Sequence, residues 1–113
     1  MIKKILALTT AFLFLITANN SFAASCYKSS EAEAEQGIRI HSELMVIGLN
    51  CQHMATANGK NLYLAYREFT NQYGDLFGGY EDVMMNYFRK NGQSNPVASI
   101  NTMRTQFANK ISK

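Results

Sequence analysis

Residues 31–51, EAEAEQGIRIHSELMVIGLNC, decide the fold of this chain because they carry its longest helical pattern. Ser30 and Glu33 fit a capping box at the start of a helix. Gly37 and Gly48 interrupt the segment, and each is either a kink or a place where another helix approaches closely. Large apolar residues recur at spacings that share one helix face, which we expect to point into the core: Ile40, Leu44, Ile47, Cys51 and Met54.

Three further segments have helical periodicity. The second helix is expected over residues 61–73 and the third over residues 79–90, while residues 74–79, GDLFGG, predict a turn or a broken helical stretch. The fourth helix has the clearest start, with Asn95 as its N-cap and Pro96 at its first helical position. The predicted fold class is therefore all-α, a compact bundle of about four amphipathic helices.

The N-terminus has the pattern of a secretory signal peptide. A short basic start, MIKK, precedes an apolar run over residues 5–18, and small residues stand at Ser21 and Ala23. We expect cleavage after Ala23, which leaves a single helical domain over residues 24–113. The alternative is a retained membrane anchor, but the apolar run is shorter than the roughly 20 residues that span a bilayer.

The charge of the mature chain gives no reason to expect a nucleic-acid partner. Without the two lysines of MIKK, the chain has nine basic and eight acidic residues, so its net charge is +1. The charge is unevenly distributed: residues 24–82 carry −4 and residues 83–113 carry +5. Such asymmetry can attract an anionic partner to the C-terminal third, or the two parts can attract one another within the bundle.

The two cysteines of an exported chain predict a disulfide between Cys26 and Cys51, which would staple the bundle. A straight helix over residues 31–51 would hold Cys51 about 30 Å from its start, too far for Cys26 to reach. The bond therefore requires a helix break, which we expect at Gly37. The alternatives are a bond between two chains, two free thiols, or a lipid anchor on Cys26, because AASC faintly resembles a lipobox.

Histidines near Cys51 raise the question of metal binding or catalysis. Cys51 and His53 would point about 160° apart on a helix, and His41 lies about 15 Å from Cys51 along the axis. We therefore expect no metal site, no cofactor and no catalytic Cys–His pair. A small hydrolase or thiol enzyme that uses His41 or His53 with a carboxylate such as Glu43 is kept as an alternative function.

Short motifs along the mature chain resemble a group of small exported proteins from alphaproteobacteria. The motifs are CY at residues 26–27, MVIGLNC at 45–51, LYLAYREF at 62–69, YFRK at 87–90 and FANKIS at 107–112. Phe107 stands where that group usually has Leu. The resemblance implies export and a helical fold, and it supplies no established activity.

The chain is rich in aromatic residues, whose spacing fits a helical core. If part of this set lines a binding surface instead, the candidate residues are Tyr63, Tyr66, Tyr80, Arg89 and Lys90. We expect a periplasmic or secreted, non-enzymatic module that binds an envelope protein or ligand, inhibitor-like or chaperone-like, with no membrane span after cleavage. A lipid-anchored structural envelope protein is the remaining alternative.

Overall fold

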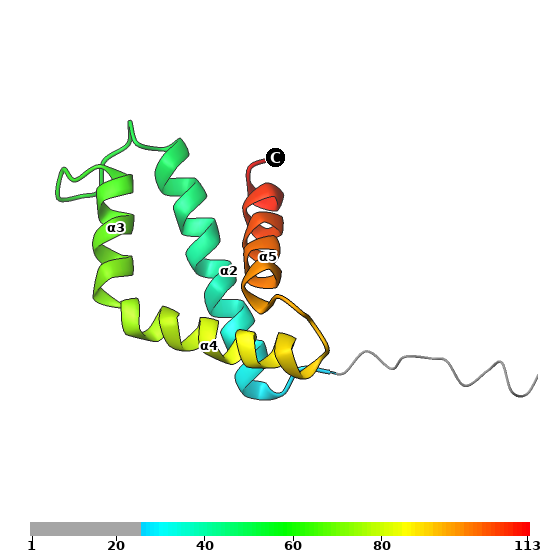
Figure 1. Cartoon of the computed structure of the whole chain (residues 1–113). Coiled ribbons are helices and arrows are strands. Elements are labelled where there is room, and N and C mark those ends of the chain that lie inside the picture. The colour runs from blue at the N-terminus through cyan, green and yellow to red at the C-terminus, as the bar shows by residue number, and fades with distance from the viewer. Residues whose placement is uncertain (1–25) are drawn as a thin grey trace, which may run out of the picture.

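The computed structural model describes residues 26–113, so the predicted signal peptide, residues 1–23, lies outside the described part. Within residues 26–113 four helices follow one another (Figure 1): α2 (Ser29–Asn50), α3 (Leu62–Gln72), α4 (Gly74–Lys90) and α5 (Pro96–Ile111). Within this part of the chain there is no strand, only an isolated bridge between Ala55 and Asn61. The prediction of an all-α, four-helix bundle is confirmed.

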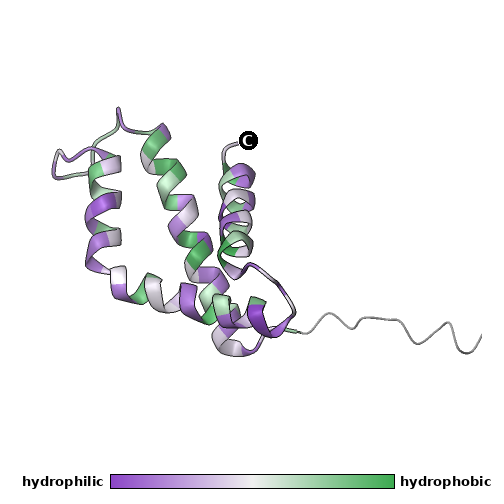
Figure 2. Ribbon diagram, viewed as in Figure 1, coloured by the Kyte–Doolittle hydropathy of each residue, from purple (hydrophilic) through white to green (hydrophobic). Residues whose placement is uncertain are grey.

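Helix α2 is the centre of the bundle. It contacts all three other helices, whereas α3 and α5 do not contact each other. Figure 1 shows α3 and α5 on opposite sides of α2, with α4 crossing near the N-terminal end of α2. Figure 2 shows that α2 remains largely hydrophobic toward its C-terminal end, beyond the level of α4. Helix α5 runs beside α2 on the side opposite α3 (Figure 1).

The helix starts are only partly as predicted. Asn61 and Asn95 cap α3 and α5 by accepting hydrogen bonds from the backbone N–H groups of Leu64 (2.9 Å) and Ala98 (3.1 Å). The predicted Ser30–Glu33 capping box is wrong, because α2 already begins at Ser29. The Glu31 carboxylate instead accepts the backbone N–H of Lys28 at 2.8 Å.

The sequence predicts a turn or a broken helical stretch over residues 74–79; the turn is wrong, and the third helix begins at Gly74 and not at residue 79. Only Tyr73 separates the end of α3 at Gln72 from the start of α4 at Gly74, and α4 contains Gly78 and Gly79. Phe77 and Tyr80, one turn apart, both pack against other parts of the fold: the Phe77 ring against His41, and the Tyr80 ring against Gly37. This packing outweighs the low helix propensity of the glycines.

The core lies where α4 and α5 cross the N-terminal half of α2. Its buried members are Ala34, Ile38, Met84, Ile100 and Met103. The stripe predicted to face the core does not do so, since Ile40 is 42% exposed, Ile47 41% and Met54 52%, whereas Ile38 is 3% exposed. Side chains two positions apart on a helix point about 160° apart, so α2 buries a different face from the predicted one.

Gly37 explains this choice of face. A Cβ atom built on Gly37 would lie 2.2 Å from Cδ2 and 2.3 Å from Cε2 of Tyr80, so the Tyr80 ring occupies the place of a side chain. The Tyr80 hydroxyl donates to Glu33 at 3.1 Å, which anchors the far end of the ring. Gly48 has a similar role toward α3, because its Cβ would lie 3.2 Å from Cβ of Tyr66. Both glycines are sites of close helix contact.

The helix break predicted at Gly37 is wrong, because α2 runs without interruption from Ser29 to Asn50. A helix of 22 residues is about 33 Å long. Cys26 precedes it and Cys51 follows it, and both thiols are free. The Cys26–Cys51 disulfide is therefore not confirmed. With α2 intact, a disulfide between Cys26 and Cys51 would have to join two different chains.

The packing at Gly37 makes a test by two matched substitutions possible. Gly37→Ala should lower the free energy of unfolding by about 1–3 kcal/mol, because the added methyl group collides with the Tyr80 ring. Gly79→Ala should raise it by about 0.5–1 kcal/mol, since Gly79 lies within α4 with no neighbour within 4 Å. Urea denaturation of both variants measures the difference. If both substitutions stabilise the protein, the Tyr80 ring does not pack against Gly37 as described.

Candidate functional site

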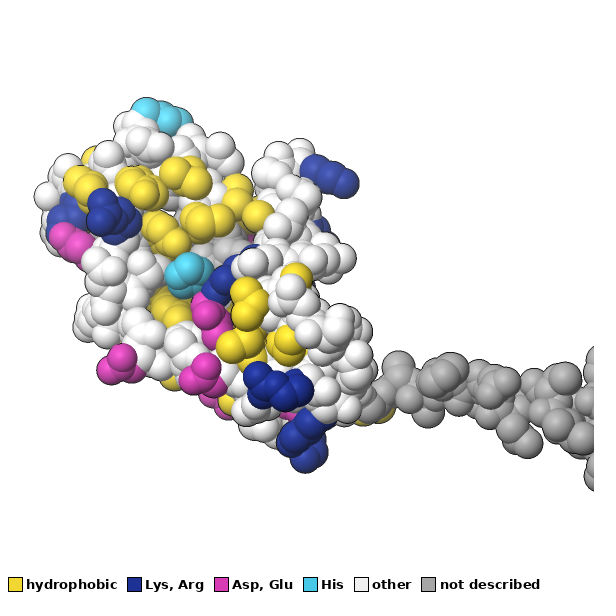
Figure 3. Space-filling view, viewed as in Figure 1, with side chains coloured by type: hydrophobic (Ala, Val, Ile, Leu, Met, Phe, Trp, Pro, Cys, Tyr) yellow, Lys and Arg dark blue, Asp and Glu magenta, His cyan; other side chains and the backbone are white. Residues whose placement is uncertain are grey.

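An apolar groove lies between α2 and α3. It has a volume of about 360 Å³, and almost all of the surface that lines it is apolar. Figure 3 shows hydrophobic side chains gathered over the adjoining parts of α2 and α3. The lining residues are Leu44, Ile47, Gly48, Leu62, Ala65, Tyr66 and Phe69.

The groove exists because α3 and α5 leave one side of α2 uncovered. Leu44 and Ile47 point away from the core formed with α4 and α5, and α5 does not reach α3. Gly48 lets the backbone of α3 come close, because a Cβ atom there would lie 3.4 Å from Cα of Tyr63. Ile47 and Phe69 remain 41% and 38% exposed. A contiguous apolar surface of this kind is typical of a binding site.

Below the groove, a half-buried polar cluster connects α2, α4 and α5. The His41 ring contacts Phe77 and Tyr66 edge-on, with ring centroids 4.9 Å and 5.7 Å apart. Arg104 of α5 forms an ion pair with Glu81 of α4, and both lie around a small depression that His41 also lines. Burial, and secondarily the positive charge of Arg104, lower the pKa of His41 below its ordinary value. The neutral ring is therefore favoured in the folded protein.

The structure does not bring the candidate catalytic residues together. His53 is exposed in the turn after α2, and Glu43 lies two positions from His41 on the same helix. Side chains at that spacing point about 160° apart. Among residues 26–113, no group of three or more His, Cys, Asp or Glu side chains is placed to hold a metal ion.

The predicted binding surface is divided among three places. Tyr63 and Tyr66 lie together on α3, with ring centroids 6.1 Å apart, and Tyr66 lines the groove. Tyr80 packs against Gly37, and Arg89 and Lys90 are exposed at the C-terminal end of α4.

Sequence reasoning missed the α2 wall of the groove, although its signal was present. Leu44 and Ile47 belong to the stripe that was assigned to the core. A second apolar direction on α2, carried by Ala34 and Ile38, was the sign that the helix has two faces to cover.

The lowered pKa of His41 predicts a pH-dependent stability. The unfolded chain takes up a proton on His41 near pH 6.5, whereas the folded protein resists it, so the free energy of unfolding falls as pH falls below that value. His41→Gln should reduce this loss, and His53→Gln, at an exposed position, should not. Urea denaturation at several pH values between about 8 and 5 measures how the free energy of unfolding of each variant depends on pH. An unchanged pH dependence in His41→Gln would refute the prediction.

None of the helices over residues 26–113 is both long enough and apolar enough to cross a membrane. Comparisons of the chain with protein-family models, curated proteins and solved structures give no match. Function must therefore be argued from the chain's own surface.

Proposed function

We propose that this protein is a non-enzymatic binding module of the cell envelope, which holds an apolar segment of a partner protein in the α2–α3 groove. The observation that carries the proposal is the apolar wall formed by half-buried Leu44 and exposed Ile47, on a helix that packs against the three other helices of the described part. Burial of apolar surface contributes roughly 25 cal/mol per Å², so covering this groove favours binding.

The chemistry of the groove selects for apolar side chains. Tyr66 supplies the only side-chain polar atom among the seven lining residues, and no lining residue is charged. A charged group placed there would lose hydration without gaining a partner. An amphipathic helix fits such a site, since its apolar residues at successive turns can lie along the groove. The lack of charged anchors favours broad recognition of apolar segments, as in a chaperone-like or inhibitor-like protein.

Placement in the periplasm or outside the cell is part of the proposal. The signal-peptide pattern of residues 1–23 and the resemblance to exported alphaproteobacterial proteins support it. Cys26 is exposed and precedes α2, so cleavage after Ala23 leaves the described fold unchanged. A lipid on Cys26 would be equally compatible with these helices.

The groove can be tested with a permanently unfolded protein, reduced and carboxymethylated lactalbumin, labelled for fluorescence anisotropy. Ile47→Glu places a charge in the groove at a position 41% exposed. It should weaken binding at least about 10-fold, which corresponds to about 1.4 kcal/mol. Leu64→Glu is the matched control, because Leu64 is 48% exposed and does not line the groove.

The control should change the affinity less than about 2-fold. Equal weakening by both substitutions would place binding elsewhere, and a wild-type protein that does not bind the unfolded chain would overturn the proposal. Circular dichroism of both variants checks that the helices persist.

A further inference from the structure

A second cavity, of different chemistry, lies on another side of α2. It has a volume of about 590 Å³, within the range of small-molecule sites. Glu35 in this cavity and Leu44 in the apolar groove are nine positions apart, so they point about 180° apart from α2. The cavity is bounded by the start of α2, the end of α4 with the following loop, and one face of α5.

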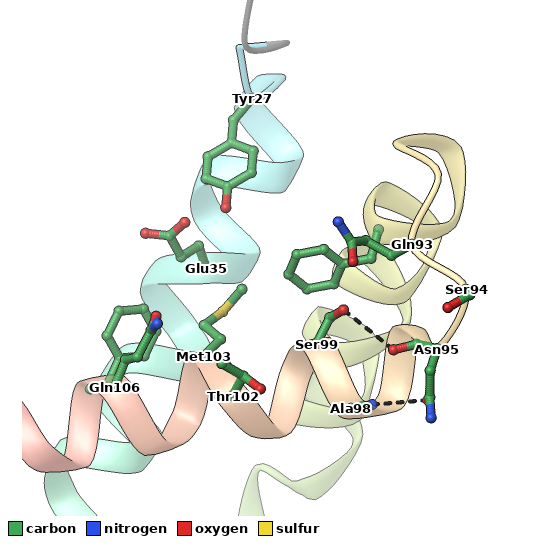
Figure 4. Close-up of a pocket in the computed structure, with 12 residues that line it drawn as sticks. Tyr27, Glu35, Gln93, Ser94, Asn95, Ala98, Ser99, Thr102, Met103 and Gln106 are labelled. Carbon is green, nitrogen blue, oxygen red and sulfur yellow. Dashed lines mark hydrogen bonds between the residues drawn. The ribbon is translucent and has the colours of Figure 1, made fainter.

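The base of the cavity is apolar. Met103 is buried, and Phe88 and Phe107 are half-buried beside it. In Figure 4, Met103 reaches from α5 toward Tyr27, which extends from the segment before α2. The guanidinium of Arg39 stacks on the Phe107 ring at 4.6 Å from its centroid and so supports this ring.

The rim carries neutral hydrogen-bonding groups that the fold does not use. The side chains of Gln93, Ser94, Thr102 and Gln106 line the cavity and make no hydrogen bond to any residue in the range 26–113. Each amide offers two N–H donors and a carbonyl acceptor, and each hydroxyl can donate and accept. Figure 4 shows Gln93 at the loop and Thr102 and Gln106 along α5. All four side chains are exposed, so their donors and acceptors are accessible to a ligand at the opening.

The cavity has little net charge available for a ligand. Among its lining residues only Glu35 is acidic or basic, and its carboxylate is paired with Arg39 at 3.2 Å. No lysine or arginine lines the cavity. A phosphate or other anion would therefore find no cation to pair with, and a neutral ligand fits better.

We propose that this cavity binds a neutral saccharide. A sugar ring has an apolar face of C–H groups, which can lie against the aromatic and thioether base, and hydroxyl groups around its edge. Those hydroxyl groups match the neutral amide and hydroxyl rim, where each can donate and accept. The site is independent of the apolar groove and of the function proposed for it.

The test uses the mature chain, residues 24–113, labelled with ¹⁵N and titrated with cellobiose and with diacetylchitobiose, an N-acetylated disaccharide. At least one should bind with a dissociation constant of about 1 mM or lower and shift the amide resonances of residues 93–107. Glycerol, which has hydroxyl groups but no ring face, should not produce these shifts.

A double variant, Thr102→Ala with Gln106→Ala, should weaken saccharide binding at least about 5-fold, because it removes two unused polar groups from the rim. Gln72→Ala is the matched control, since Gln72 is exposed on α3 and lies outside this cavity. Its affinity should equal that of the wild type. The proposal is overturned if neither disaccharide binds or if glycerol produces the same shifts. It is also overturned if the protein prefers a peptide to both sugars, or if the double variant binds the saccharide as tightly as the wild type.

Discussion

The contact between Gly37 and Tyr80 is the constraint on which the rest of the fold depends. Because Gly37 has no side chain, the Tyr80 ring lies directly against the backbone of α2, and its hydroxyl is held by Glu33. This contact fixes where α4 crosses α2. The crossing places Ile38 and Met84 in one core with α5, and it turns Leu44 and the rest of its stripe away from that core.

The number and type of the helices could be predicted because they depend on local chemistry. Apolar spacing, and Asn95 with Pro96 at the start of α5, act within one or two turns of the chain. The buried face of α2 could not be chosen in this way, since its apolar stripe outweighs Ile38 and Ala34 in side-chain size. The glycine that decides between the two faces acts through Tyr80, which lies more than forty residues later.

The candidate site could be predicted only in part, because it too depends on contacts between residues that are far apart in the sequence. Tyr66 was identified from its aromatic character, and the structure places it in the groove. Leu44 and Ile47 were identified as apolar but assigned to the core, because only the separation of α3 from α5 shows that nothing covers them. The proposed binding surface is thus the part of the α2 stripe that the bundle leaves unused. Its existence depends on the crossing of α4 at Gly37.

The most direct test of this account compares two isoleucines two positions apart on α2. Ile38 is 3% exposed and Ile40 is 42% exposed, so truncation should have unequal effects on the free energy of unfolding. Ile38→Ala should cost about 2–5 kcal/mol, with Ile38→Val at about 0.5–1.5 kcal/mol if the alanine variant does not fold, and Ile40→Ala should cost less than about 1 kcal/mol. A larger cost at Ile40 than at Ile38 would show that α2 buries the opposite face and would contradict the account.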